Sequence, residues 1–243
     1  MRMEWLMGLK QDFITCFIEK DRWKYIVGGL GNTVKIALAA VLIGVVIGTI
    51  VAIIRSTHDK NIQDMKKGPG RTLLIIADKI CKIYLTVIRG TPVMIQIMIM
   101  FFVVFSKARD GVPVAMLTFG INSGAYVAEI IRGGIMAVDP GQMEAGRSLG
   151  FGFAKTMWYI VIPQALKGVL PALANEFIAL LKETSVACYV AVNDLTKGGE
   201  IIRSATYIQA MPLFVVAALY LIMVMVLSYL VGRLERRLRT SER

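Results

Sequence analysis

Four ionisable side chains lie inside long apolar stretches, where a charge needs a partner. At the centre of a membrane helix a charge costs roughly 2.5 to 3.5 kcal/mol, so each group should face protein or a water-filled cavity. Glu129 can pair with Arg132 three residues later, and we weigh this local ion pair against a role in binding. The four residues are Glu129, Glu176, Lys182 and Glu183.

A fifth charged group lies at a helix break. Arg89 is followed by Gly90, Thr91 and Pro92, which predicts that one helix ends here and another begins. Free backbone donors at such a break, together with a guanidinium group, suit a carboxylate ligand.

The sequence offers little for catalysis. It contains no paired carboxylates, nucleophile elbow or glycine-rich phosphate loop, so we expect neither an enzyme nor ATP binding by this chain. Cys16, Cys81 and Cys188 are too far apart for a metal or redox motif. The single histidine, His58, is expected in a polar loop, so we predict no metal site and no general base.

Composition points to a membrane protein. Of the 243 residues, 56% are hydrophobic, and the mean hydropathy is +0.63. Residues 36–54 and 204–232 carry no charge, and runs of about 18 or more such residues are typical of membrane-spanning helices. We therefore expect an all-α, multi-pass protein of the cell membrane with about five spans.

The net charge of +11 comes from basic residues that cluster in the loops between the predicted spans, so it does not indicate nucleic-acid binding. Residues 55–89 hold eight basic residues and the tail after Gly232 holds five, whereas the loops at 107–112 and 193–210 hold two each. The positive-inside rule therefore places residues 55–89, the segment near 139–168 and the C-terminus in the cytoplasm, with the N-terminus outside.

The predicted elements follow from this pattern. Residues 1–27 form an amphipathic interfacial segment, residues 28–232 the transmembrane domain and residues 233–243 a basic cytoplasmic tail. Spans are expected at 30–54, 93–105, 113–131, 169–192 and 211–231, with a polar loop at 55–70 and an oblique helix at 73–88. Gly44 and Gly48 form a small-xxx-small pair that permits close helix packing.

A polar segment interrupts the hydrophobic helices at residues 144–150, with the sequence Glu-Ala-Gly-Arg-Ser-Leu-Gly, and Ile-Val-Ile-Pro follows at 160–163. Such a segment must lie in water or against another protein, and we interpret it as the docking surface for a separate motor subunit. It resembles the EAA loop of ATP-binding cassette importer permeases. Gly146 and Ile162 stand where that pattern has alanine and leucine, and Gly146 would loosen a short helix by roughly 1 kcal/mol.

Further motifs resemble the polar amino acid permeases of that superfamily. They are Arg-Gly-Thr-Pro at 89–92, Asn-Ser-Gly-Ala-Tyr-Val-Ala-Glu at 122–129, Pro-Gln-Ala at 163–165 and Lys-Glu-Thr-Ser at 182–185. The resemblance extends over residues 28–239. It implies a type I importer fold in which two permease chains, a copy or a relative of each other, face one another across a pathway.

The resemblance also implies partners and contact residues. A coupling helix at about 141–153 would enter a cleft of a cytoplasmic ATPase dimer, which binds the ATP, so this chain needs no cofactor. An extracytoplasmic binding protein would deliver the substrate. The residues expected to contact the ATPase are Glu144, Ala145, Gly146, Arg147, Leu149, Gly150 and Phe151.

For the substrate, the resemblance implies amino acids with polar or charged side chains. Arg89 and Thr91 are candidates for the carboxylate of the substrate, and Glu129 or Glu183 for its ammonium group, with Asn122 and Tyr126 lining the path. Each of these could instead be a helix-packing residue.

The sequence therefore predicts the permease subunit of an ATP-driven amino acid importer that works by alternating access. An ion-coupled secondary transporter is one alternative and would need inverted repeats with matching broken helices, of which we find no convincing second copy. A membrane-embedded enzyme or scaffold is the other, and it would need a catalytic cluster or lack a pathway.

Overall fold

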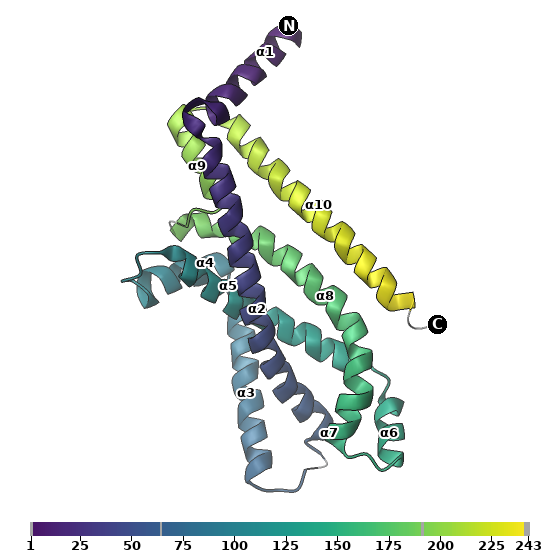
Figure 1. The fold of residues 1–243 in the computed structure, drawn as a ribbon. Coiled ribbons are helices and arrows are strands. Elements are labelled where there is room, and N and C mark those ends of the chain that lie inside the picture. The colour runs from purple at the N-terminus through teal and green to yellow at the C-terminus, as the bar shows by residue number, and fades with distance from the viewer. Residues whose placement is uncertain (1, 64, 191, 241–243) are drawn as a thin grey trace. The chain divides into compact units, whose positions relative to one another are not determined.

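The computed structural model describes residues 2–63, 65–190 and 192–240, which form helices and connecting turns without a strand. Figure 1 shows the order of the helices along the chain. The α-helices are α1 Arg2–Phe13, α2 Trp23–Asn61, α3 Pro69–Gly90, α4 Val93–Ile99, α5 Gly111–Met136, α6 Pro140–Ser148, α7 Phe153–Thr156, α8 Ile162–Glu183, α9 Leu195–Thr206 and α10 Ala210–Thr240. Short π-helical turns (η1 Ile14–Ile18, η3 Met100–Val104, η4 Met157–Val161) and 3-10 turns (η2 Glu19–Asp21, η5 Thr184–Val190) extend several of them.

Within the described residues, four helical stretches are long and apolar enough to cross a membrane: Trp23–Asn61, Gly111–Met136, Phe153–Val190 and Ala210–Leu238. The bent pair Pro69–Gly90 and Val93–Val104 is a fifth candidate if it counts as one span. The prediction of an all-α protein with about five spans is thereby confirmed, as is the helix break after Arg89.

The described residues form two compact units. The first contains Met1–Ala39, Met94–Phe119 and Ile178–Ser228, and the second contains Ala40–Val93, Gly120–Phe177 and Tyr229–Arg243. The divisions between units fall inside helices α2, α4, α5, α8 and α10.

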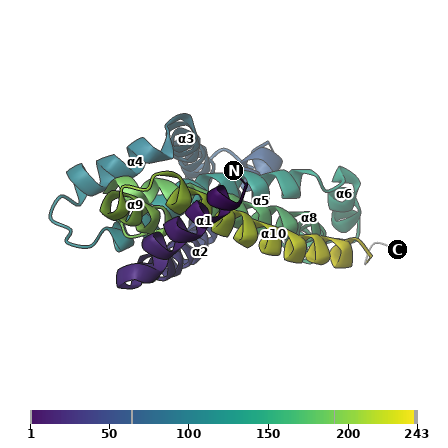
Figure 2. The same ribbon diagram turned by 90° about the horizontal axis from the view of Figure 1, so that it is seen from above.

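In the first unit, α9 packs beside the first turns of α2 (Figure 2). A Cβ at Gly198 would lie 2.6 Å from the carbonyl oxygen of Tyr25, so only glycine allows this approach. Asp194 caps α9 by accepting hydrogen bonds from the backbone N–H groups of Thr196 (3.2 Å) and Lys197 (2.9 Å). Burial raises the pKa of Asp194 above its usual range, and these hydrogen bonds oppose that rise.

In the second unit, α2 packs against α5 through glycines on both helices. A Cβ at Gly48 would lie 2.5 Å from Cγ1 of Val127, and one at Gly44 would lie 3.0 Å from Cβ of Ser123. A Cβ at Gly120 of α5 would lie 2.6 Å from Cγ2 of Ile43 on α2. The use of Gly44 and Gly48 for close packing is confirmed, while the matching pair Gly120 and Gly124 on α5 was not predicted.

The loop expected at 193–210 contains a helix instead, α9 (Leu195–Thr206), whose N-terminus is capped by Asp194. Three further elements differ from the predicted ones. The prediction of a loop at 55–70 is wrong for residues 55–61, because α2 continues to Asn61. The charged side chains of this last part of α2 form ion pairs with α3 and α5. The segment before α2 is not one helix, since Lys20 and Asp21 have φ values of 55° and 54°. The helix that should begin at Val169 begins at Phe153, because α7, η4 and α8 follow each other without a break.

The π-helical turn η4 lies directly before Pro163, in the helical stretch that runs from Phe153 to Glu183. Pro163 has no backbone N–H to donate to the preceding turn. The N–H of Ile162 bonds to the carbonyl oxygen of Met157, five residues earlier, and the side chain of Gln164 donates to the carbonyl oxygen of Ile160 (3.0 Å), so helical bonding is present on both sides of the proline. Residues 160–163 are therefore part of a continuous helix.

The glycine contacts generate a prediction for α2. Gly48→Ala should destabilise the protein by about 1 to 3 kcal/mol, because its methyl group overlaps Val127. Gly31→Ala on the same helix is the matched control, since a Cβ there has open space, and it should leave stability unchanged or raise it by up to about 1 kcal/mol. Thermal unfolding of the two purified variants in detergent measures both effects, and equal midpoints would contradict the packing argument.

Candidate functional site

A cluster of charged side chains joins α2, α3 and α5 within the second unit. At its centre Asp78 of α3 is only 2% exposed. One of its carboxylate oxygens lies 2.7 Å from Nζ of Lys82 one turn later, and the other lies 3.5 Å from Nε of Arg55 on α2. A buried carboxylate is tolerated only with such partners, so Asp78 fixes α3 against α2.

Glu129 of α5 faces three guanidinium groups. Its carboxylate oxygens lie 3.3 Å from Arg55, 3.4 Å from Arg89 and 3.9 Å from Arg132. The predicted local pair of Glu129 with Arg132 is present, but it is the longest of the three. The shorter contacts bridge separate helices, so Glu129 holds Arg89 of α3 and Arg55 of α2 in place.

His58 and Asp59 extend the cluster along α2. Nδ1 of His58 lies 3.5 Å from Asp59 and 3.8 Å from Asp78, and Asp59 also accepts from Arg132 at 3.3 Å. His58 therefore lies in a helix and not in the expected polar loop. These three potential metal ligands lie within 4.8 Å of one another, but Lys82, Arg55 and Arg132 already face the two carboxylates, which favours an ion-pair network over a cation site.

A cavity of about 480 Å³ opens beside the charge cluster. Its charged lining consists of Arg55, Lys82, Arg89 and Glu129, and Tyr126, Leu85, Thr86 and Gly90 complete it. The guanidinium group of Arg89 lies over the ring of Tyr126 at 5.5 Å from the ring centroid. With 43% of its side chain exposed, Arg89 has capacity for a further hydrogen-bonding partner.

Three of the six predicted substrate residues meet at this cavity: Arg89, Tyr126 and Glu129. Thr91 instead closes the end of α3, where its hydroxyl donates to the carbonyl oxygen of Val87 at 2.8 Å. Asn122 is buried in α5 next to Ser123, whose hydroxyl donates to Glu176 at 3.0 Å. Glu183 belongs to the other unit, at the end of α8.

Sequence reasoning missed Arg55, Asp59 and the pairing of Asp78. A signal for one contact was visible, because Asp78 and Lys82 are four residues apart on a helix. The contacts of Arg55 with Asp78 and Glu129 join residues 23 and 74 positions apart, and no local pattern reveals them.

The predicted coupling segment forms a short helix and an exposed turn. Pro140 begins α6, and the side chain of Asp139 accepts from the N–H of Gly141 at its N-terminus. Gly150 ends the turn with a φ of +84°, which favours glycine. Leu149 is 75% exposed and Phe151 is 40% exposed, so both apolar side chains are available to a partner.

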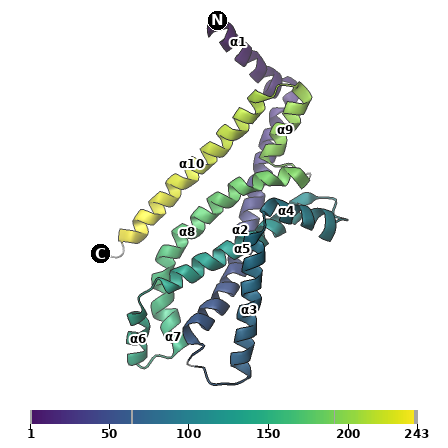
Figure 3. The ribbon, with the colours of Figure 1, turned by 180° about the vertical axis from the view of Figure 1, so that it is seen from behind.

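Gly146 faces inward, unlike its neighbours on α6. It is buried, whereas Glu144, Ala145 and Arg147 are exposed. Figure 3 shows α6 beside α7, and a Cβ at Gly146 would lie 2.5 Å from Cγ2 of the fully buried Thr156. Helix propensity alone predicts only that Gly146 loosens α6. The structure shows that the absence of a side chain at Gly146 also lets α6 approach α7.

Together, these features define a multi-pass helical membrane protein with a charged cavity and an exposed polar helix. The chain belongs to the family of binding-protein-dependent transport system inner membrane components, which matches residues 73–240. It is thus a multi-pass inner membrane protein, and permeases of this kind act with an ATPase and a substrate-binding protein.

Relatives with assigned names agree with this membership. The glutamine transport system permease protein of Escherichia coli is 38% identical over 68% of this chain and 77% of its own length. The arginine transport system permease protein of Bacillus subtilis is 32% identical, with 90% and 94% covered. The L-cystine transport system permease protein of the same organism is 31% identical, with 91% and 89% covered.

Solved structures show the same fold. The crystal structure of an amino acid ABC transporter with histidines contains a chain 38% identical to this one, with a TM-score of 0.77 over 88% of this chain and 94% of that chain. An inward-facing methionine ABC transporter, at 18% identity, has a TM-score of 0.74 over 90% and 99% and supports the fold alone. The predicted importer transmembrane fold is confirmed.

The contact of Gly146 with Thr156 generates a second prediction. Gly146→Ala should destabilise the protein by about 1 to 3 kcal/mol, because the β-branched Thr156 has little freedom to move away. Replacing Thr156 by alanine in the same chain removes the overlapping methyl group and should restore much of the loss. Thermal unfolding of both single variants and the double variant measures this coupling, and strictly additive effects would refute it.

Proposed function

We propose that this chain forms the transmembrane pathway of an ATP-driven amino acid importer and that catalysis lies on a separate ATPase. Membership of the binding-protein-dependent transport family carries this proposal, and the relatives named for glutamine, arginine and cystine support the substrate class. ATP would bind the partner, because the sequence holds no phosphate loop. A second permease chain, a copy or a relative, would complete the pathway.

For the substrate we propose that Arg89 binds the carboxylate group that all amino acids share. Arg89 is half-exposed at the cavity, and Tyr126 and Glu129 fix its orientation. Gly90 also lines the cavity at the end of α3. A guanidinium group held in this way is suited to bidentate recognition of a carboxylate.

Glu129 is a poorer candidate for the ammonium group than the sequence suggested. Its two oxygens already face Arg55, Arg89 and Arg132, so a substrate cation would compete with three guanidinium groups. We therefore assign Glu129 to positioning Arg89. Thr91, Asn122 and Glu183 remain candidates along the pathway, each to be tested by its own substitution.

For coupling we propose that α6 and the turn after it dock on the ATPase. Glu144 and Arg147 are exposed and can form ion pairs with a partner, and Leu149 and Phe151 can fill an apolar notch. Ala145 and Gly150 belong to the same exposed surface, whereas the buried Gly146 supports it from behind. Movement of α6 with the ATPase would then switch the spans between inward and outward opening.

Arg89→Ala should raise the KM for uptake of all transported amino acids by about 10- to 100-fold, because it removes a charged hydrogen bond to a group they share. Uptake into vesicles that contain the reconstituted transporter measures this effect for several amino acids. Arg89→Lys is the matched control, since it keeps the charge and loses the planar fork, and it should have an intermediate effect. A loss confined to one amino acid would assign Arg89 to side-chain recognition.

Leu149→Asp should weaken binding of the cognate ATPase by at least about 10-fold, because it places a charge in an apolar contact. Pull-down of the ATPase by the purified permease measures the effect. Met65→Asp adds the same charge to the segment between α2 and α3 and should leave binding unchanged. Normal ATPase binding and transport by the Leu149 variant would refute the assigned docking surface.

A further inference from the structure

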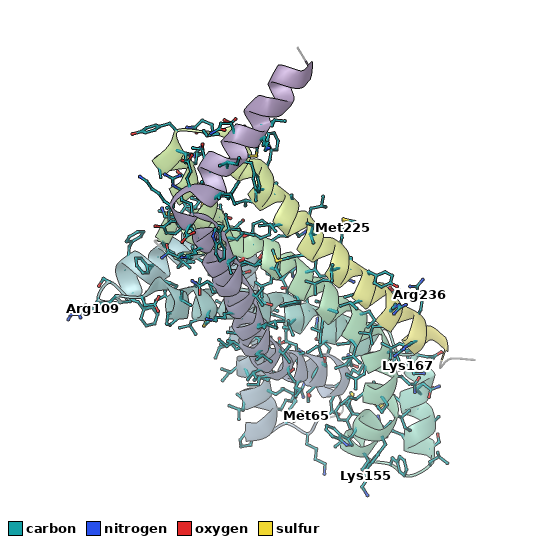
Figure 4. All side chains as sticks on the ribbon, turned by 45° about the horizontal axis from the view of Figure 1, so that its top comes forward. Met65, Arg109, Lys155, Lys167, Met225 and Arg236 are labelled. Carbon is teal, nitrogen blue, oxygen red and sulfur yellow. The ribbon has the colours of Figure 1, made fainter. Side chains whose placement is uncertain are left out.

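The last turns of α10 carry three arginines on one face of the helix. Tyr229, Arg233 and Arg237 follow each other at intervals of four residues, and Arg236 lies beside them at an interval of three. We call these four residues the arginine stripe. Arg233, Arg236 and Arg237 are all exposed, and Figure 4 shows Arg236 near the C-terminal end of α10.

The length of α10 sets the depth of the stripe. Residues 211–232 carry no charge and are helical, and about 22 helical residues extend over about 33 Å. The hydrocarbon core of a bilayer is about 30 Å thick. When the uncharged part fills that core, the arginines that follow Gly232 lie at the level of the lipid headgroups.

Apolar side chains continue directly into the stripe. Tyr229 is 56% exposed, Leu230 54% and Leu234 39%. The guanidinium group of Arg233 lies 4.9 Å from the centroid of the Tyr229 ring, so the tyrosine orients the first arginine. Only 11% of the apolar window of α10 is buried within this chain, so its apolar side chains can contact lipid.

We propose that the arginine stripe binds the phosphate of an anionic phospholipid whose acyl chains lie along Tyr229 and Leu230. Guanidinium groups bind phosphate oxygens through paired hydrogen bonds, and basic residues next to a membrane-spanning helix are attracted to anionic lipids. Glu235 is the one acidic residue among residues 229–240, so the described end of the helix keeps a net positive charge. A soluble phosphate would use the arginines alone, whereas a lipid also uses the exposed apolar residues.

The test uses the purified full-length permease in neutral detergent. Binding of phosphatidylglycerol and of phosphatidylcholine is measured by native mass spectrometry as each lipid is titrated. We expect the triple variant R233Q/R236Q/R237Q to bind phosphatidylglycerol about 100-fold more weakly than the unchanged protein, with phosphatidylcholine unaffected. The triple variant R233K/R236K/R237K, which keeps the charge, should retain most of the binding.

The matched control removes the same charge elsewhere. K66Q/K67Q/R71Q removes three charges from the turn before α3 and from the first turn of α3. Residues 55–65, which carry both acidic and basic side chains, separate Lys66 from the uncharged part of α2. Its phosphatidylglycerol binding should stay within about threefold of the unchanged protein. An equal loss in both variants would refute the proposal, because the effect would then reflect total charge.

Two further outcomes would also overturn the proposal. If inorganic phosphate displaces phosphatidylglycerol at equal concentration, the site recognises the free anion and not the lipid. If R233Q/R236Q/R237Q still binds phosphatidylglycerol but no longer binds the partner ATPase in neutral detergent, the arginine stripe is a protein-docking surface. Unchanged circular dichroism and gel-filtration profiles of all variants would show that the fold is intact.

Discussion

Partnered charge within hydrophobic helices is the constraint on which the second unit depends. Asp78 is almost completely buried and meets Lys82 and Arg55, while Glu129 meets Arg55, Arg89 and Arg132. Removing one partner of a buried ion pair leaves an uncompensated charge, which typically costs 3 to 5 kcal/mol. Arg55 contacts both carboxylates, so α2, α3 and α5 are held by one shared guanidinium group.

This arrangement also explains how a flexible arginine can form a binding group. An unrestrained arginine side chain loses about 2 kcal/mol of rotamer freedom when it binds. Glu129 and Tyr126 already restrict Arg89 at the end of α3, so less freedom remains to be lost. The helix break at Thr91 and Pro92 leaves Arg89 beside an end of helix where backbone groups lack intrahelical partners.

The sequence predicts elements better than it predicts partners. The apolar runs, the break after Arg89 and the close packing at Gly44 and Gly48 are local patterns, and all three were predicted correctly. The extension of α2 to Asn61 was missed because Arg55, His58 and Asp59 look like loop residues until their partners on other helices are known. The cavity combines side chains from three helices, so only its members Arg89, Tyr126 and Glu129 could be proposed in advance.

Gly146 shows why the effect of a departure from a family pattern on stability cannot be judged from that position alone. Helix propensity alone favours alanine there by about 1 kcal/mol, which makes the glycine look like a defect. The structure places the buried Thr156 where the alanine methyl group would lie, so the sign of the effect depends on a residue ten positions away. A chain with alanine at 146 needs a smaller group at 156 or a wider gap between α6 and α7, and the surface offered by Leu149 and Phe151 would move with α6.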